Sequence, residues 1–287
     1  MREEDIQARF AQNAYAASLG IQLTDIGHER AALYLPYQVT HSNPGGTLNG
    51  GVTATLLNTA GTLAAWTGVD IQPEVFVGTV DLSVQYLTAA VEEDVVATAK
   101  VLRRGRDLFF LESAVRNLAD QPICQGLMIY RAPNYAGRPR RTYAEPALLP
   151  TLTRSLHPEP LSRLGEFIHT LQVTTTHEQP GRVRLTMPCT ADHVDEQGHL
   201  AEGALAALLD IAGTAASWTL AKRQGSRGAT IGMQLSYLNP AQDAVVADAQ
   251  VQQRSEELFF STVQITTMTS RQIVAMGNVS YRILEGS

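Results

Sequence analysis

The chain contains two strongly apolar segments in which alanine and leucine occur on every side of a helix. Residues 50–67 read GGVTATLLNTAGTLAAWT, and residues 202–219 read EGALAALLDIAGTAASWT. A helix that is apolar all round is buried, whereas a surface helix has one polar face. Each segment therefore predicts one long helix inside a hydrophobic core.

Segments rich in Val, Thr, Tyr and Phe follow each helix, and turn residues separate them, which is typical of β-strands. The predicted strands cover 75–86, 94–103, 108–117 and 123–130 in the first half, and 229–237, 244–253, 258–267 and 273–283 in the second. Before the first helix, residues 21–37 predict two strands around a turn at Gly27, and residues 171–187 hold the same place in the second half. Charge and alanine at helical spacing predict a short leading helix over 3–18.

The two halves are copies of one segment. The helical segments align without gaps, and 10 of their 18 positions are identical. Trp66 and Trp218 are 152 residues apart, Tyr86 and Tyr237 are 151 apart, and the Leu-Phe-Phe triplets at 108–110 and 258–260 are 150 apart. A period this long indicates a duplicated domain, because solenoid repeats span roughly 20–50 residues.

The division of the chain follows from the repeat. We expect a first domain over residues 1–132 and a second over 161–287, each of a common domain size. Residues 133–160 contain six prolines, which predicts a linker between the domains.

Composition narrows the possible partners and the compartment. The formal net charge of −6 argues against a nucleic-acid partner, which needs a basic face. The two cysteines, Cys124 and Cys189, occupy non-matching positions, so we expect free thiols and no disulfide framework. The N-terminus lacks the apolar region of a signal peptide, and no apolar run is suited to span a bilayer. We therefore expect a cytoplasmic protein without a membrane partner.

A buried helix followed by a long antiparallel sheet is the plan of the hotdog fold, and specific residues strengthen this likeness. The stretch NPGGTLNGG, which begins at Asn43 and is followed by Asn58, resembles the signature of PaaI-like thioesterases of the 4-hydroxybenzoyl-CoA thioesterase superfamily. That signature has Asn, then Gly-Thr-Leu-His-Gly-Gly, and an Asp seven residues after the last Gly. The same family places Ser or Thr seven residues before a Tyr, as in Thr79–Tyr86 and Thr230–Tyr237.

The resemblance implies an α+β fold with two tandem hotdog domains, each a long antiparallel sheet wrapped around a buried helix, paired as a pseudo-dimer. It also implies hydrolysis of acyl-CoA or a related acyl thioester. Such a reaction needs hydrogen-bond donors for the carbonyl oxygen, which a helix N-terminus provides. It also needs a carboxylate in an apolar pocket as base or nucleophile.

Neither copy contains both parts. The first copy has Asn43, Asn49, Gly50 and Gly51 at its helix start, but it has Asn58 at the acid position. The second copy has the acid, Asp210, but its helix start reads Ala-Glu-Gly over 201–203. In PaaI-like enzymes each site joins the helix start of one subunit to the acid of the other, so the resemblance implies one complete site between the copies.

In that site the Gly50 N–H would polarise the thioester carbonyl, and Asp210 would activate water or attack directly. Asn43 would hold the water, Thr230 would support Asp210 or the substrate, and Gly51 would allow close approach of the substrate. Asn49 stands where the family has His, so it can donate a hydrogen bond but cannot carry a proton at neutral pH.

The remaining residues would form a degenerate second site from Glu202, Asn58 and Thr79. Structural alternatives stay open at each position. Asp210 could cap a neighbouring loop, threonine is common in strands, and an acidic residue at position 202 is favoured at a helix start. Glu202 could also be a substitute acid.

Arg103, Arg104 and Arg106 form a turn that resembles the basic turn meeting the CoA phosphates in this family. Residues 253–256 of the second copy, Gln-Arg-Ser-Glu, have lost most of this charge, which suggests that one CoA is bound. A solvated turn is the alternative.

No metal or cofactor is expected, because His193 and His199 lack metal-ligand spacing and no nucleotide-binding motif is present. We expect an acyl-CoA or similar thioester as ligand and a homodimer of double-hotdog chains. The first rival function is a catalytically silent acyl-CoA-binding or regulatory protein. The second is a hotdog hydratase or dehydratase, whose Asp and His motif we do not find.

Overall fold

The computed structural model describes residues 2–69, 77–105, 107–132, 165–221 and 225–284. The first copy contains α1 (Glu3–Phe10), α2 (Ala14–Ser18), β1 (Gln22–Gly27), β2 (Arg30–Leu35), α3 (Gly50–Thr67), β3 (Gly78–Tyr86), β4 (Val95–Arg104), β5 (Leu108–Asn117) and β6 (Pro122–Arg131). The second contains α4 (Phe167–Thr170), β7 (Thr174–Gln179), β8 (Arg182–Met187), α5 (Glu202–Trp218), β9 (Arg227–Tyr237), β10 (Val245–Ser255), β11 (Leu258–Thr267) and β12 (Ile273–Leu284).

The predicted buried helices and strands are present, with boundary shifts of one to three residues. The predicted helix over 50–67 is α3, and α5 ends one residue before the predicted end. Residues 75 and 76 of the first predicted strand, and the predicted linker over 133–160, lie outside the described residues. The extent of the two predicted domains therefore stays a prediction.

Two local predictions differ from the structure. The leading segment forms two helices, because Asn13 interrupts the first and caps the second by accepting a hydrogen bond from Ala16 N at 2.8 Å. The hairpin turn falls at residues 28–29, after Gly27, and Glu29 adopts a φ of 56° there.

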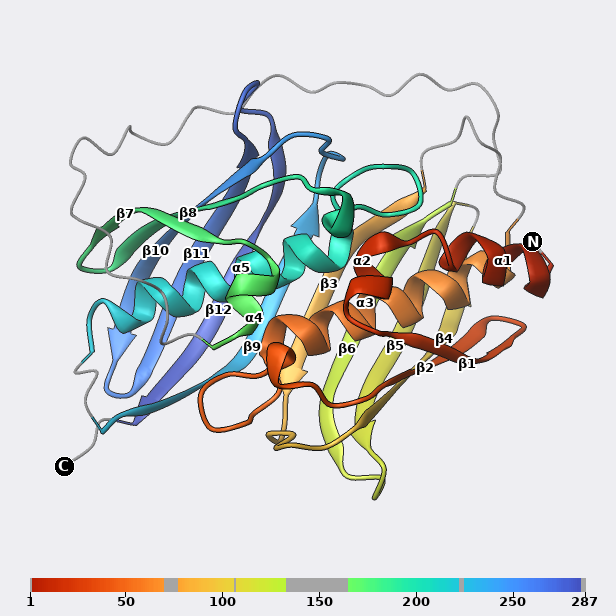
Figure 1. The fold of residues 1–287 in the computed structure, drawn as a ribbon, viewed down its shortest axis with the longest axis horizontal. Coiled ribbons are helices and arrows are strands. Elements are labelled where there is room, and N and C mark those ends of the chain that lie inside the picture. The colour runs from red at the N-terminus through yellow and green to blue at the C-terminus, as the bar shows by residue number, and fades with distance from the viewer. Residues whose placement is uncertain (1, 70–76, 106, 133–164, 222–224, 285–287) are drawn as a thin grey trace.

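All strands of the described chain belong to one antiparallel sheet with the order β1-β2-β4-β5-β6-β3-β9-β12-β11-β10-β8-β7 (Figure 1). The copies meet where β3 pairs with β9, and the centre of this pairing joins Ser83 to Gln234, which are equivalent positions 151 residues apart. The two copies are therefore related by a pseudo-twofold axis through the middle of the sheet. This is the tandem hotdog arrangement that the sequence predicted.

The long helices α3 and α5 lie against one face of this sheet (Figure 1). Their alanines and leucines are buried on all sides, because the sheet surrounds one part of each helix and the other helix covers another part. The indole N–H of Trp66 donates to the Tyr130 hydroxyl at 2.7 Å, and Trp218 donates to Tyr281 at 3.1 Å. The repeated tryptophans therefore bind each helix to its own half of the sheet.

Glycine in the first turn of each long helix allows the two helices to touch. A Cβ on Gly51 would lie 2.6 Å from the Ala207 Cα, and a Cβ on Gly203 would lie 2.6 Å from a methyl carbon of Thr55. The Thr55 hydroxyl also donates to the Gly203 carbonyl at 3.0 Å. This contact brings the start of each helix beside the second turn of the other.

The N-terminal helix α1 packs on α3 of its own copy and reaches the second copy through an ion pair. The Arg9 guanidinium lies 2.8 Å from the Glu196 carboxylate and 4.6 Å from the centre of the Trp66 ring.

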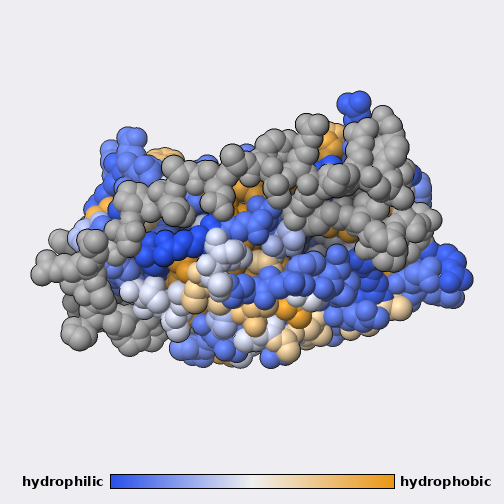
Figure 2. Space-filling view, turned by 90° about the horizontal axis from the view of Figure 1, so that it is seen from above, coloured by the Kyte–Doolittle hydropathy of each residue, from blue (hydrophilic) through white to orange (hydrophobic). Residues whose placement is uncertain are grey.

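Seen from above, the described surface is mostly hydrophilic, with smaller hydrophobic areas between (Figure 2). No helix of the described chain is long and apolar enough to cross a membrane.

Candidate active site

The start of α3 is organised by two asparagines. Asn49 is the N-cap of this helix, and its Oδ1 accepts a hydrogen bond from Gly51 N at 2.8 Å. Its Nδ2 donates to Asn43 Oδ1 at 2.7 Å, so the capping residue is itself held by the preceding loop. The first glycine, Gly50, contributes no side chain, which leaves its N–H approachable at the positive end of the helix dipole.

Asp210 faces this helix start from the third turn of α5. The Asp210 side chain is buried, and its Oδ1 accepts a hydrogen bond from the Thr230 hydroxyl at 2.7 Å. Burial raises the pKa of Asp210 from 3.8 to about 6, and the bond from Thr230 partly opposes this rise. A carboxylate with this pKa is ionised at neutral pH and is still a better proton acceptor than an exposed aspartate.

The helix start and the acid lie directly against each other. A Cβ on Gly50 would lie 2.8 Å from Asp210 Oδ2 and 3.4 Å from a ring carbon of Tyr86. Tyr86 ends β3, and its hydroxyl donates to the Gly50 carbonyl at 3.0 Å. The structure thus brings Asn43, Asn49, Gly50, Asp210 and Thr230 together, with groups from both copies.

The equivalent positions form a second cluster with a different chemistry. The Glu202 carboxylate accepts hydrogen bonds from the backbone N of Thr79 at 2.7 Å, from the Thr79 hydroxyl at 2.5 Å and from Asn58 Nδ2 at 3.1 Å. Burial raises the pKa of Glu202 as well, while these donors oppose the rise. Glu202 is the equivalent of Gly50 in the second copy. Its side chain therefore occupies the second cluster and binds both Thr79 and Asn58.

The two clusters lie at the two opposite edges that the strand ends form, at either end of the central strand β3. Thr79 is the second residue of β3 and Tyr86 is the last, so they are about 20 Å apart along the strand. Because β9 runs antiparallel to β3, Thr230 lies toward the Tyr86 end and Tyr237 toward the Thr79 end. Each cluster consequently takes a threonine from one copy and a tyrosine from the other.

A cavity of about 60 Å³ adjoins the second cluster, and its lining includes Asn58, Glu202, Phe10, Tyr15 and Trp66. Sites that hold small organic molecules usually measure about 300–1,000 Å³, whereas this volume suits one or two water molecules. This cavity is therefore smaller than the usual size of a site for a small organic molecule.

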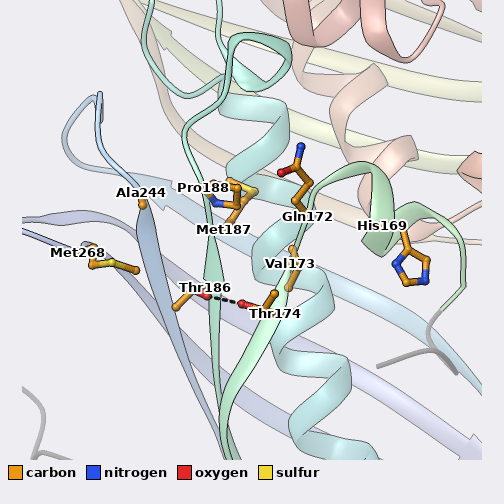
Figure 3. A pocket seen from close by; sticks show the side chains of 9 residues that line it. All are labelled: His169, Gln172, Val173, Thr174, Thr186, Met187, Pro188, Ala244 and Met268. Carbon is orange, nitrogen blue, oxygen red and sulfur yellow. Dashed lines mark hydrogen bonds between the residues drawn. The ribbon is translucent and has the colours of Figure 1, made fainter. Parts of the chain in front are cut away.

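A larger open groove of about 530 Å³ lies in the second copy, beside the β7–β8 hairpin (Figure 3). Its nine lining residues include Met187, Met268 and His169, which is the one titratable side chain among them. None of the predicted site residues lines this groove, so it contributes nothing to the candidate chemistry.

The structure does not bring the basic turn to the Gly50–Asp210 site. The register runs from Arg104 through Phe109 and Tyr130 to Thr79, which places Arg103 and Arg104 at the edge of the second cluster. The sequence could not reveal this, because the edge depends on strand register. Arg106 lies outside the described residues.

Gly51 has a packing position where substrate contact was expected. A Cβ on Gly51 would lie 2.6 Å from the Ala207 Cα of α5, and the Gly51 N–H is already bonded to Asn49. The sequence did not predict Tyr86 as a site residue, although its recurrence as Tyr237 in the second copy is a signal.

Within the described chain, no group of three or more His, Cys, Asp or Glu residues could hold a metal ion.

Known proteins share both the sequence pattern and the fold. The thioesterase superfamily pattern matches residues 45–124 and 197–274, so each copy carries one match. Human acyl-coenzyme A thioesterase 13 is 39% identical over 88 residues, which cover 30% of this chain and 61% of that protein.

Solved structures match nearly the whole chain. The tesB protein of Mycobacterium avium subs paratuberculosis has a TM-score of 0.64 at 13% identity, covering 99% of this chain and 100% of that one. A protein with a hot dog fold from Alicyclobacillus acidocaldarius has a TM-score of 0.65 at 15% identity, covering 96% and 99%. These likenesses show the tandem fold, and the sequence pattern shows the family. The chain belongs to the thioesterase superfamily and is a thioester hydrolase.

Proposed function

We propose that this hydrolase acts on acyl-CoA or a closely related acyl thioester, at one competent site in each chain. The observation that carries the proposal is the 2.8 Å between Asp210 Oδ2 and the position of a Cβ on Gly50. A carboxylate of one copy and a side-chain-free helix start of the other thus lie directly against each other. The name of the human relative supports the choice of acyl-CoA.

The Gly50 N–H donates to the thioester oxygen, which becomes more negative as the carbonyl carbon is attacked. A fixed donor at a helix N-terminus stabilises this charge without reorganisation during the reaction. The glycine is needed because any side chain at this position would meet Asp210.

Asp210 supplies the attack in one of two ways. As a base it takes a proton from a water held by Asn43, the hydroxide adds to the carbonyl carbon, and the C–S bond breaks. The proton then passes from Asp210 to the departing thiolate, which leaves a carboxylic acid and a free thiol. As a nucleophile it displaces the thiolate to form a mixed anhydride, which water then hydrolyses.

Thr230 keeps the Asp210 carboxylate oriented and partly ionised through its hydrogen bond. Asn49 acts by capping α3 and holding Asn43. This role needs no proton transfer, so an asparagine can replace the histidine that the family has at this position. We also propose that the chain forms a homodimer and is located in the cytoplasm.

The proposal is tested by comparing Asp210→Asn with Asn58→Ala on a panel of acyl-CoA esters. We expect Asp210→Asn to lower kcat by about 1,000-fold or more, the upper range for loss of an acid–base group. Asn58→Ala should keep most of the activity, although it removes two hydrogen bonds from the second cluster. The reverse result would place the chemistry at the other edge, and acyl-CoA binding without turnover by the unmodified protein would favour a silent binding protein.

A further inference from the structure

The peptide between Gly50 and Gly51 is held by three side chains of its own copy. Asn49 Oδ1 accepts from Gly51 N at 2.8 Å, and the Gly50 carbonyl accepts from the Thr53 hydroxyl at 2.8 Å and from the Tyr86 hydroxyl at 3.0 Å. Two successive glycines have the weakest intrinsic preference for the helical conformation. These side-chain hydrogen bonds therefore add to the backbone bonds of α3 in holding this peptide.

Tyr86 differs from the other two groups because it comes from the sheet. It is the last residue of β3, so its bond links the start of α3 to the strand that joins the two copies. Its ring also lies 3.4 Å from the position of a Cβ on Gly50, which in turn is 2.8 Å from Asp210 Oδ2. Tyr86 thus lies beside the pair of groups, Gly50 and Asp210, at which the proposed reaction takes place.

The tyrosine acts as a donor and does not exchange its proton near neutral pH. Burial, and then the negative charge of Asp210, raise the pKa of Tyr86 well above its ordinary value. Its hydroxyl therefore keeps donating to the Gly50 carbonyl over the working pH range.

We propose that Tyr86 is a positioning residue for the reaction proposed above, on which this inference rests. Its bond ties the first residue of α3 to the end of β3, so the helix start, with the Gly50 N–H, keeps its place beside Asp210. Without the bond, the helix start can shift relative to the sheet, and the donor spends part of its time out of line with the acid. Tyr86 would then affect the rate of the chemical step more than substrate binding.

The second copy provides a matched control. The Tyr237 hydroxyl donates to the Glu202 carbonyl at 3.0 Å, which is the same bond at the equivalent position. There the helix starts with one glycine instead of two, and Thr79 and Asn58 independently hold the Glu202 side chain. Loss of the Tyr237 hydroxyl should consequently leave both the Gly50 N–H and the Asp210 carboxylate in place.

The experiment compares Tyr86→Phe with Tyr237→Phe in the full chain, using one acyl-CoA ester over a range of pH. We expect Tyr86→Phe to lower kcat about tenfold and to change KM less than about twofold, since orientation of a donor contributes to the transition state. The acid limb of its pH–rate profile should keep its position. Tyr237→Phe should keep kcat within about twofold of the unmodified protein, because it removes the same type of hydrogen bond at the distant edge.

Equal losses of kcat in the two variants would overturn the positioning role, as would a rise of KM with unchanged kcat. If Tyr86→Phe fails to fold, Thr53→Val removes the other side-chain donor to the Gly50 carbonyl, and it should lower kcat in the same selective way. Asp210→Asn in the same assay separates the two proposals. Full activity in that variant would sink the proposed function, whereas loss there together with an unaffected Tyr86→Phe would sink only this inference.

Discussion

The starts of α3 and α5 hold equivalent places in the two copies but carry different side chains. At the first, Gly50 has no side chain, and Asp210 of the other helix lies against it. At the second, Glu202 extends its own carboxylate and binds Thr79 and Asn58. The difference teaches that the side chain at the first helical position decides whether the acid beside the helix start comes from the other helix or from the same one.

The largest effect that would sharpen this comparison is expected from Gly50→Ala. The new Cβ would lie 2.8 Å from Asp210 Oδ2, so the acid or the helix start must shift. We expect kcat to fall by about 100-fold or more, as on loss of one oxyanion donor. The twin change, Glu202→Ala, should keep kcat while lowering the melting temperature, because it leaves buried donors unpaired. A catalytic loss in the twin would show that the second cluster takes part in turnover.

The next effect concerns stability and the sign of its pH dependence. Because burial raises the pKa of Asp210 from 3.8 to about 6, the folded state binds this proton more tightly than the unfolded state does. The associated stability is present below about pH 4 and is lost as the pH rises through about 6, a difference of about 3 kcal/mol.

Asp210→Asn should therefore melt about 5 °C or more above the unmodified protein at pH 7.5, and only slightly above it at pH 4. Calorimetry at the two pH values measures this. A lower melting temperature at both would support the alternative in which Asp210 is chiefly structural.

Thr230→Val is expected to have an intermediate effect. It removes the hydrogen bond that opposes the rise of the Asp210 pKa, so the acid limb of the pH–rate profile should move to higher pH. We expect kcat near pH 6.5 to fall roughly tenfold, within the usual range for acid–base contributions. Thr79→Val is the matched change at the other edge, and a similar shift of the acid limb there would contradict the assignment.

The smallest effect is expected at the arginine turns. Arg103 and Arg104 lie on the same side of the sheet as the second cluster. In the second copy, strand pairing runs from Arg254 through Phe259 and Tyr281 to Thr230, so Arg254 lies on the side of the Gly50–Asp210 site. Arg254→Glu should raise KM for CoA esters about threefold, in proportion to a solvent-exposed ion pair, and more at low salt. The double change Arg103→Glu with Arg104→Glu should leave KM nearly unchanged. A larger effect of the double change would mean that the substrate reaches across to the basic turn.

Much of the fold could be predicted because it is encoded locally. The all-round apolar pattern of residues 50–67 and the strand composition that follows each helix need no knowledge of distant contacts. The break at Asn13 was missed because a side-chain cap competes with helical spacing that continues through it. The short helix α4 depends on packing of buried Phe167 and Ile168 and carries little pattern of its own.

The candidate site was partly predictable for the same reason. Asp210 and Gly50 stand out because the repeat shows what each copy lacks at the matching position. The edge on which Arg104 lies depends on three strand registers, and the packing of Gly51 on Ala207 depends on how the helices cross. Neither is written in the order of residues. Tyr86 could have been singled out as a strand-to-helix tether only once its bond to Gly50 was visible.

The continuous pairing of β3 with β9 has a consequence for how such an enzyme can change over generations. In an assembly of two identical subunits, every substitution enters both halves at once, so a change that harms one of them harms the other. Here each half has its own gene segment, yet both share one uninterrupted ladder of hydrogen bonds. One margin of the molecule can therefore acquire new side chains while the opposite margin keeps its chemistry.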